Sequence, residues 1–311
     1  MKQIIILFSI FFISIQLYGQ ETIFFVQKKP NGQIEEFYVL KSDKNTKHGT
    51  YVKYRMAFGN VIILESGNFN NGQKHGDWQS FYDSNKYKNS LKERGTYFNG
   101  SRNGLWSTFY MDTTSNFTGI EKYGKKKTAD SLAVNIEQKA LKIKQAGIFI
   151  KDKRVGEWVT YNFNGELIQK YNFNTIELFY DREIKDSLEY NKTRKATFLG
   201  GKKFLIDYLN ENITRGLPLL NRNNIHFKVS FTIDENGKIT DLKVIDSNLL
   251  DKTNSNLLSV FYNLDSSWIV ALDNGNKVKY TYQAEWKVSK EKTTHMAYHY
   301  KDWKVAFTLS D

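Results

Sequence analysis

The sequence predicts a mainly β N-terminal repeat sheet followed by an α+β domain. Two observations predict this order. A phrase of about sixteen residues, with two glycines nine residues apart and a tryptophan two residues further on, occurs three times in the first half. From about residue 196 the apolar residues follow helical spacing, then strict alternation, then helical spacing again. A chain of 311 residues has room for both units.

Each copy of the phrase is typical of a β-hairpin. The copies are Gly67–Tyr82, Gly95–Tyr110 and Gly147–Tyr161, and a weaker one is His48–Tyr54. Asn-Gly pairs at 71–72 and 99–100 supply the positive φ angles of a type I′ turn. A single hairpin cannot bury its apolar face, so we expect the copies to stack side by side in one sheet.

The repeated positions indicate structure rather than catalysis. Trp78, Ser80 and Tyr82 occupy alternate positions of a predicted strand, which places them on one face of the sheet. Glycines and aromatic residues repeat, and we expect no titratable residue to repeat with them. Core packing is therefore predicted for the repeat tryptophans, with sugar stacking as the alternative: Trp78, Trp106 and Trp158.

The phrase resembles the MORN-type repeat, in the bacterial variant described as antitoxin-component-like. The resemblance covers about residues 35–175, and the chain between Tyr110 and Gly147 is an insertion. We therefore assign residues 20–175 to MORN-like β-hairpin repeats with an insertion at about 111–146. The spacing of glycines and aromatic residues is specific for the repeat and does not specify a function.

The second half has a different pattern. His226–Ile233 alternates apolar and polar residues, and Asp234–Gly237 is typical of a hairpin turn. The apolar parity changes between Ile239 and Leu242, which predicts a β-bulge in the returning strand. The predicted elements are a helix around 204–213, strands at 226–233 and 239–245, a helix around 257–264 and a strand at 278–288. This order indicates an α+β domain.

Residues 196–288 resemble the C-terminal domain of TonB-type proteins. The resemblance depends on Phe198–Gly201, on Val229–Val244 across the hairpin, and on Trp268 followed by Asn274-Gly275. The family usually has proline at the positions of Leu199 and Val270, so the likeness concerns the fold first. Residues 176–195 are then predicted to be a linker between the two units.

The resemblance implies a partner as well as a fold. TonB-type domains contact outer-membrane TonB-dependent transporters by β-strand addition, which uses the unpaired hydrogen-bonding groups of a sheet edge. The candidate partner-binding edge consists of Val278, Lys279, Tyr280, Thr281, Tyr282, Gln283 and Ala284.

The chain continues past this domain in a tail, 289–311. Apolar and polar residues alternate again at 302–309, which predicts one extra strand. The simplest placement is antiparallel to the strand at 278–288, where the extra strand covers the candidate edge.

The N-terminal residues predict export. A basic start, an apolar run of about a dozen residues and a small residue at Gly19 are typical of a signal peptide, 1–19, that is cleaved near Gly19. The alternative is an inner-membrane anchor formed by residues 4–18. Cysteine is absent, so disulfides and thiol chemistry are excluded. We expect a periplasmic or secreted protein.

Nothing in the sequence predicts catalysis, a cofactor or a metal. Gly200–Lys203 lacks the length and hydroxyl of a phosphate-binding loop, and the pair His295 and His299 has no evident third ligand. The formal net charge of +12 favours weak association with anionic surfaces and no nucleic-acid role in an exported protein.

We therefore expect an exported, non-enzymatic cell-envelope protein that acts through protein–protein interaction and is related to TonB-dependent transport. Two alternatives stay open. One is a genuine TonB-type energy transducer, and the other is a cell-wall or glycan-associated binding protein or enzyme.

Overall fold

The computed structural model describes residues 20–85, 89–111, 141–182, 184, 186–216, 224–262, 264, 267–290 and 303–310. The signal peptide and its cleavage near Gly19, the alternative anchor at 4–18, most of the insertion at 111–146, and the pair His295 and His299 lie outside these residues. The described chain is mainly β, with few helices.

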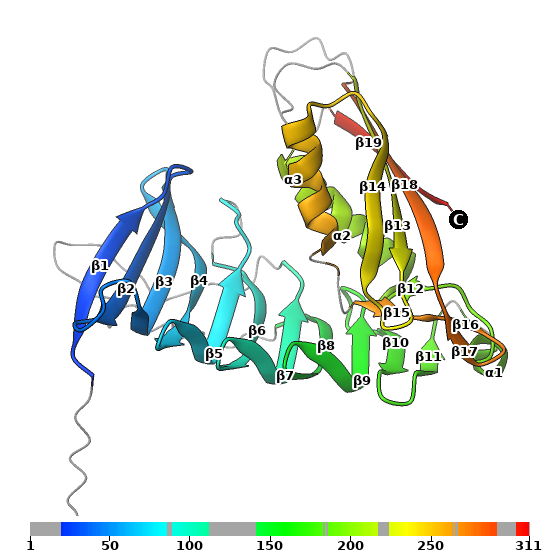
Figure 1. The fold of residues 1–311 in the computed structure, drawn as a ribbon, viewed down its shortest axis with the longest axis horizontal. Helices are drawn as coiled ribbons and strands as arrows, with labels where there is room; N and C mark the ends of the chain where they lie inside the picture. Colours follow the sequence, from blue (N-terminus) through cyan, green and yellow to red (C-terminus); the bar gives the residue numbers. More distant parts are fainter. Residues whose placement is uncertain are drawn as a thin grey trace, which may run out of the picture.

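The N-terminal unit is one antiparallel sheet in which each strand pairs with the next along the chain, so the described part has an 11-stranded meander. Its strands are β1 (Thr22–Lys28), β2 (Gln33–Leu40), β3 (Lys47–Ala57), β4 (Asn60–Asn70), β5 (Gln73–Phe81), β6 (Leu91–Phe98), β7 (Ser101–Phe109), β8 (Ile143–Ile150), β9 (Lys153–Tyr161), β10 (Leu167–Asn172) and β11 (Glu177–Asp181). Figure 1 shows these strands as a long curved strip, with the C-terminal unit over its β8–β11 end.

The predicted hairpin turns are confirmed. Asn71 and Gly72 have φ angles of 47° and 80°, and they join β4 directly to β5. Asn99 and Gly100 join β6 to β7 in the same way. The turn between β8 and β9 differs, because Lys151 and Asp152 have positive φ there and neither is a glycine.

Each repeat tryptophan lies against a glycine of the preceding strand. A Cβ atom on Gly95 would overlap the indole of Trp106, so only glycine fits beneath the ring. The indole N–H of Trp106 donates a hydrogen bond of 3.1 Å to the carbonyl of Thr96, the residue after that glycine. The same contact and hydrogen bond occur in the other copies, where Trp78 pairs with Gly67 and Asn68, and Trp158 with Gly147 and Ile148.

The second glycine of each copy makes a β-bulge. Gly76, Gly104 and Gly156 have φ angles of 70°, 81° and 59°. On the β4–β5 pair the register moves from Ser66↔Gln79 to Asn68↔His75, so three residues of β5 face one of β4. Glycine adopts this positive φ without steric cost.

A second register shift changes which aromatic residues share a face. The prediction that Trp78, Ser80 and Tyr82 simply alternate on one face is wrong in part, because the pairing of β5 with β6 shifts between Ser80 and Phe81. Trp78, Phe81 and Tyr82 are all buried, whereas Ser80 is half-buried. Strict period-2 counting therefore fails at this position.

The C-terminal unit has the element order predicted for it. Its elements are β12 (Thr197–Phe198), α2 (Gly201–Gly216), β13 (Asn224–Ile233), β14 (Ile239–Ser247), α3 (Asp251–Tyr262), β15 (Trp268–Ile269), β16 (Ala271–Asp273), β17 (Asn276–Val278), β18 (Tyr280–Lys290) and β19 (Trp303–Ser310). Its main sheet has the order β14-β13-β18-β19. The predicted bulge is confirmed by the positive φ of Asp241 and by the register shift opposite it.

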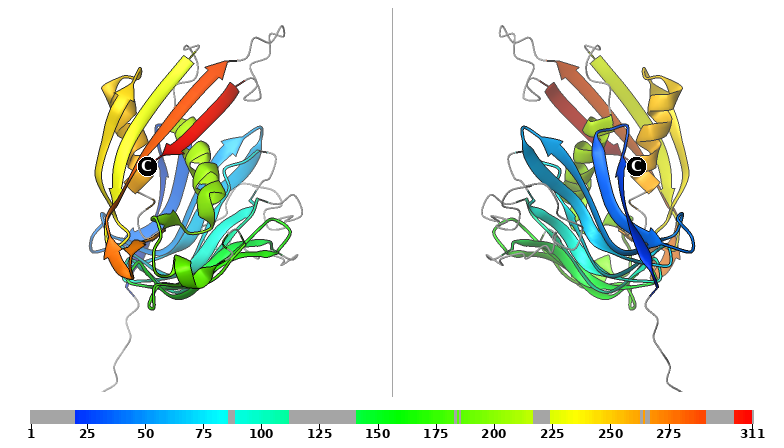
Figure 2. Two further views of the ribbon diagram at one scale, coloured as in Figure 1. Left: turned by 90° about the vertical axis from the view of Figure 1, so that its right-hand side faces the viewer. Right: turned by 90° about the vertical axis from the view of Figure 1, so that its left-hand side faces the viewer.

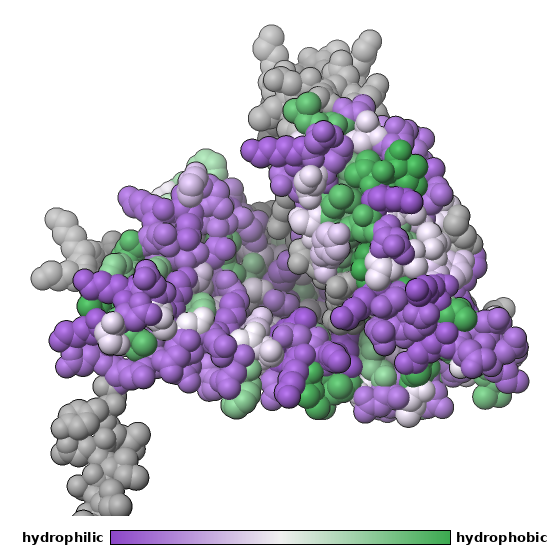
Figure 3. All heavy atoms as spheres, in the orientation of Figure 1, coloured by the Kyte–Doolittle hydropathy of each residue, from purple (hydrophilic) through white to green (hydrophobic). Residues whose placement is uncertain are grey.

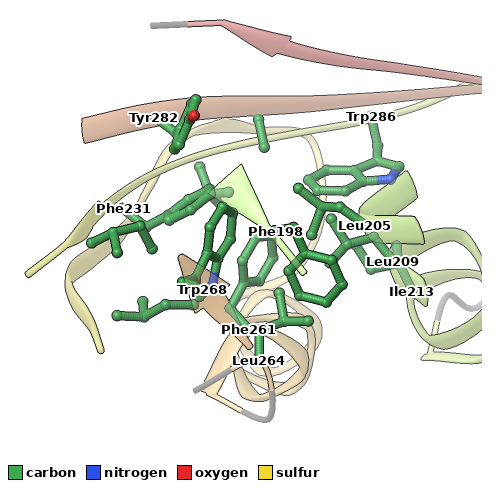
Figure 4. Close-up of a cluster of buried hydrophobic side chains, with 14 of the residues drawn as sticks. Phe198, Leu205, Leu209, Ile213, Phe231, Phe261, Leu264, Trp268, Tyr282 and Trp286 are labelled. Atoms are coloured by element: carbon green, nitrogen blue, oxygen red, sulfur yellow. The ribbon is translucent and has the colours of Figure 1, made fainter. Parts of the chain in front are cut away.

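The core of this unit lies between the sheet and the two helices. Phe231, Tyr282 and Trp286 extend from the sheet toward α2 and α3, where Leu209 and Phe261 pack against them (Figure 4). All five side chains are buried. The amphipathic helices predicted around 204–213 and 257–264 therefore cover one face of the sheet. No helix among the described residues is long and apolar enough to span a membrane.

The linker predicted at 176–195 is wrong as a description of this segment. It contains β11, the last strand of the large sheet, and a short helix α1 (Ser187–Tyr190). Arg194, which is 6% exposed, then joins the two units. Its guanidinium donates to the Tyr171 hydroxyl and the Ile176 carbonyl on the sheet side, and to the Val270 carbonyl in the C-terminal unit. The sequence lacks alternation here, so the short strand is not evident from it.

The two units share a hydrophobic core. Leu199 and Ile269 of the C-terminal unit pack in one cluster with Trp106, Trp158 and Tyr171 of the sheet. Two buried hydrogen bonds cross the same contact: Gln145 donates to the Leu199 carbonyl at 2.9 Å, and the Gly200 N–H donates to Gln169 at 2.8 Å. Figure 2 shows the C-terminal unit against the concave side of the large sheet.

The glycine–tryptophan contact generates a test by double-mutant cycle. Trp106→Ala should lower the free energy of unfolding by about 3–5 kcal/mol, because it empties a buried site. Gly95→Ala should cost about 1–3 kcal/mol in the native background by overpacking against the indole, and much less when Trp106 is already alanine.

Urea unfolding of the four proteins measures this coupling. Leu105→Ala is the control, because Leu105 is 65% exposed beside the core tryptophan and its loss should change stability by no more than about 0.5 kcal/mol. Strictly additive effects of Gly95→Ala and Trp106→Ala would show that the ring does not press on the glycine.

Candidate functional site

The structure does not bring the candidate edge residues, Val278–Ala284, together on a free edge. Val278 belongs to the small hairpin β16–β17, and β18 lies inside the main sheet between β13 and β19. β19 pairs antiparallel with β18 from Gln283↔Ser310 to Lys290↔Trp303. A strand therefore lies where the sequence predicts the extra strand, and only Tyr280–Tyr282 of β18 lack a β19 partner.

The side chains of this segment serve the core more than a surface. Tyr282 is buried, and its hydroxyl donates to the Ala196 carbonyl. Tyr280 and Gln283 are half-buried, whereas Lys279 and Thr281 are exposed. From Gln283 to Lys290, β19 therefore occupies the side of β18 at which strand addition of the TonB type would take place.

A larger candidate site lies where the two units meet. A cleft of about 1130 Å³ separates the hairpin edge of the repeat sheet from the C-terminal unit. The sheet contributes Lys74, Tyr97, Arg102, Arg154, Tyr171 and Phe173, and the turn between β8 and β9 contributes Lys151, Asp152 and Lys153. The facing wall includes Glu235, Asn236, Lys238, Tyr262, Trp268, Val270 and Lys277. Figure 3 shows a mainly hydrophilic surface on this side of the molecule.

A cation repeats in the hairpins, which corrects the expectation that no titratable residue does so. Two residues before the second glycine of each copy stands a lysine or arginine, in the order Lys47, Lys74, Arg102 and Arg154. We call these four residues the cation row. The row was not predicted because no single residue type repeats in it, since two lysines are followed by two arginines, although the position itself is visible in the sequence.

Each member of the cation row stands over an aromatic ring of the sheet. The Nζ atom of Lys74 is 4.0 Å from the ring centre of Trp78. The guanidinium carbon of Arg102 is 4.0 Å from the ring centre of Phe149, and that of Arg154 is 4.3 Å from Trp158. Such contacts attract a cation to the negative face of the ring.

Acids and hydroxyls hold the same cations from the side. Lys47 bonds Glu35 at 3.0 Å, Lys74 bonds Glu65, and Arg102 bonds Asp152 at 3.1 Å. Arg154 reaches across the junction, where it donates a hydrogen bond of 2.9 Å to the hydroxyl of Ser267 in the C-terminal unit. The row is therefore positioned before any ligand arrives.

The backbone fixes the row as well. The carbonyl of each of the first three cations accepts a hydrogen bond from the second turn residue of the next hairpin. The pairs are Gly72 to Lys47, Gly100 to Lys74 and Asp152 to Arg102, at 2.7, 2.9 and 3.1 Å. Consecutive hairpins are thus locked to one another at the cleft edge.

The aromatic rings beneath the row form a continuous ladder. Ring centres are 5.2 Å apart for Tyr97 and Trp106, 6.1 Å for Trp106 and Phe149, and 5.0 Å for Phe149 and Trp158. The pairs meet edge to face, which is the favoured geometry for neighbouring rings. Trp106 and Trp158 are only 4% and 2% exposed, so the ladder is core and offers no open ring face for a sugar.

The turn between β8 and β9 is strained where it borders the cleft. Lys151 and Asp152 have φ angles of 48° and 64°, where the other copies have Asn-Gly. A left-handed conformation costs an ordinary residue roughly 1–2 kcal/mol. Asp152 offsets part of this cost, because it accepts hydrogen bonds from both the backbone N–H and the guanidinium of Arg102.

The charges of the cleft stay fixed near neutral pH. Burial, with a contribution from Arg102, lowers the pKa of Arg154 to about 9, so this side chain remains protonated. Burial raises the pKa of Tyr97 and of Tyr171 to about 12, so both phenols remain neutral. Of the described lining residues, seven are lysine or arginine and two are acidic. The cleft is therefore strongly positive.

Within the described residues, no group of three or more His, Asp and Glu side chains gathers as a metal site would require. The chain matches no protein-family model, and a search of curated proteins finds no significant match. The resemblance to MORN-type repeats and to TonB C-terminal domains therefore stays a prediction.

The Arg102–Asp152 pair generates a pH test. Burial alone raises the pKa of Asp152, but its hydrogen bonds from Arg102 and the positive charge outweigh this and hold the pKa below its ordinary value of 3.8. Because the pKa of Asp152 is lower in the folded state than in the unfolded state, its ionised carboxylate stabilises the fold at any pH above the unfolded-state pKa. This stabilisation is lost as the pH falls through the folded-state pKa.

We therefore expect the stability difference between the native protein and Asp152→Asn to be constant above about pH 5 and to shrink below about pH 4. Asparagine suits the control, since it tolerates the left-handed turn. Denaturant unfolding at a series of pH values measures the difference. In an Arg102→Gln background the pH dependence should become smaller, because the guanidinium is lost while the backbone N–H of residue 102 still bonds Asp152. An unchanged pH dependence would show that the guanidinium does not contribute to it.

Proposed function

We propose that the protein is an exported, non-enzymatic cell-envelope protein that acts by binding another protein, and that its binding surface is the positive cleft between the two units. MORN-type repeats form one wall and a TonB C-terminal-like domain forms the other. The observation that carries the proposal is the cation row, which the fold holds in place on one side of a large cleft.

Three properties of the cleft support a binding role. Its volume exceeds the roughly 300–1,000 Å³ of a typical small-molecule site. Its two walls come from units that share a core, so its shape is set by folding. Its cationic side chains are held in place by aromatic rings, by acidic partners and by backbone hydrogen bonds, so they lose little conformational entropy when a partner binds.

The alternative of a TonB-type energy transducer is less well supported. Transporter contact by strand addition requires an edge strand with unpaired backbone groups. From Gln283 to Lys290 the edge of β18 that the resemblance implies is paired with β19, so a partner strand would have to add to an outer strand, β14 or β19, instead. A glycan-binding role is disfavoured by the burial of the repeat tryptophans.

Site-specific crosslinking distinguishes these possibilities, because the chain has no cysteine of its own. Lys153→Cys places a photo-crosslinker in the cleft, and Thr281→Cys places it on the open part of β18. We expect a discrete protein adduct from Lys153→Cys in native cell envelopes and none from Thr281→Cys.

Leu188→Cys, at a position on α1 that is 78% exposed, is the control for random capture. An adduct from Thr281→Cys without one from Lys153→Cys would contradict the proposal and favour strand addition. Equal labelling from all three positions would show that capture is not specific.

The pairing of β19 with β18 generates a separate prediction. Deletion of residues 303–311 leaves the backbone of Gln283–Lys290 unpaired on one side, and such an edge promotes association between chains. We expect the shortened protein to form dimers or larger species at concentrations where the full chain is monomeric or less associated. Analytical ultracentrifugation measures the change, and unaltered sedimentation would show that β19 does not protect the edge.

A further inference from the structure

The cleft has features that select the chemistry of its partner. This inference rests on the proposed function, because it names what the same cleft binds. Lys74, Arg102 and Arg154 line one wall, and Lys238 and Lys277 stand on the other. Lys151 and Lys153 add two more cations, and the acids of the described lining are Asp152 and Glu235. A ligand that fills the cleft must therefore carry negative charge.

The row cations keep hydrogen-bonding capacity for a ligand. A lysine has three N–H donors and an arginine has five. Lys74 has one acid partner, Glu65, and Arg102 has one, Asp152, so each pair uses only part of these donors. A second carboxylate can bind on the cleft side without displacing the first.

The spacing of the row determines the spacing of the ligand charges. Lys74, Arg102 and Arg154 lie on β5, β7 and β9, and one strand separates each from the next. Two strand spacings amount to at least about 9.4–9.8 Å. A segment extended in the polyproline II conformation advances about 3.1 Å per residue with three residues per turn. Carboxylates three residues apart then lie about 9.3 Å apart on one face of the segment, so they can meet successive cations.

The apolar lining of both walls favours a peptide over other polyanions. Val270 on the facing wall, and Phe173 and Ile176 on the sheet side, add apolar surface that suits side chains between the acids. The indole N–H of Trp268, a buried donor at the cleft wall, has no acceptor among the described residues, and a peptide carbonyl would supply one. The repeat tryptophans are buried, so their rings offer no stacking faces to sugars or nucleic-acid bases.

The recess also disfavours a membrane surface. The cations lie between two units whose contact is fixed by Arg194 and by the shared core around Leu199. A flat bilayer cannot follow the walls of such a cleft, whereas a single extended segment can enter it.

We infer that the cleft takes an extended acidic segment of a partner protein, with carboxylates about three residues apart that face Lys74, Arg102 and Arg154. The segment lies across β5–β9, with its intervening side chains against Trp268 and Val270.

Two synthetic peptides of nine residues and identical composition test this inference by isothermal titration with the full chain. In the first, aspartates occupy positions 1, 4 and 7, and in the second they occupy positions 1, 2 and 3; both have blocked ends. We expect the spaced peptide to bind at least about five-fold more tightly at low salt, and to weaken as salt is raised.

Two charge-matched variants locate the binding. Lys153→Gln/Lys238→Gln removes one exposed cation from each wall, and Lys28→Gln/Lys192→Gln removes two exposed cations outside the cleft. The first pair should weaken the spaced peptide about five- to ten-fold, and the second less than about two-fold. Lys74→Gln, with folding checked by thermal unfolding, should abolish the preference for the spaced peptide.

Other outcomes overturn the inference. Equal affinity for both peptides, with equal loss in both double variants, would show general charge attraction only. Tighter, cleft-dependent binding of polygalacturonate or of phosphatidylglycerol vesicles would assign the cleft to a different polyanion. A cleft adduct in the crosslinking experiment together with no preference for the spaced peptide would leave the binding role intact and refute the acidic segment alone.

Discussion

The contact between an indole ring and a glycine on the preceding strand is the constraint on which the repeat sheet depends. The ring of Trp106 occupies the space of an absent Cβ on Gly95 and donates to the next carbonyl. This fixes the distance and register between the strands of one hairpin, and the bulge at Gly104 then turns the ring inward. Because the same contact recurs in three copies, the ladder of rings and the row of cations above it follow from one local arrangement.

Burial of the rings also explains why basic residues repeat beside them. An aromatic ladder on an open sheet face would leave apolar surface in water, and the stems of Lys74 and Arg102 cover part of it while their charges remain near solvent. The acids Glu65 and Asp152 then limit the repulsion between neighbouring cations. The positive charge of the cleft is in this sense a consequence of how the repeat buries its tryptophans.

The sequence predicted most of the regular elements, because their signals are local. Asn71-Gly72 specifies its turn through backbone preference alone, and the alternation of His226–Ile233 specifies a strand. The failures arose where structure depends on distant residues. β11 is held by the side chain of Asn191, which bonds the backbone of Leu178, and by its pairing with β10, neither of which leaves a periodic pattern. The cleft could not be predicted, since it exists only where Leu199 and Ile269 join the core of the sheet.

The cleft and the cation row have different origins, and this separates what the repeats do from what the junction does. The row extends to Lys47, which stands 4.4 Å from the ring centre of Phe37 but does not line the cleft. The row is thus a property of every copy of the repeat, whereas the facing wall exists only where Arg194 and the shared core fix the C-terminal unit over β8–β11. A hairpin sheet by itself would present an open cationic face. Addition of the second unit converts part of that face into a recess, and recessed charges are less screened by salt than exposed ones. The choice of binding partner therefore depends on the junction between the two units, which shapes the cleft. The positive charge of the cleft depends on the cations of the repeat.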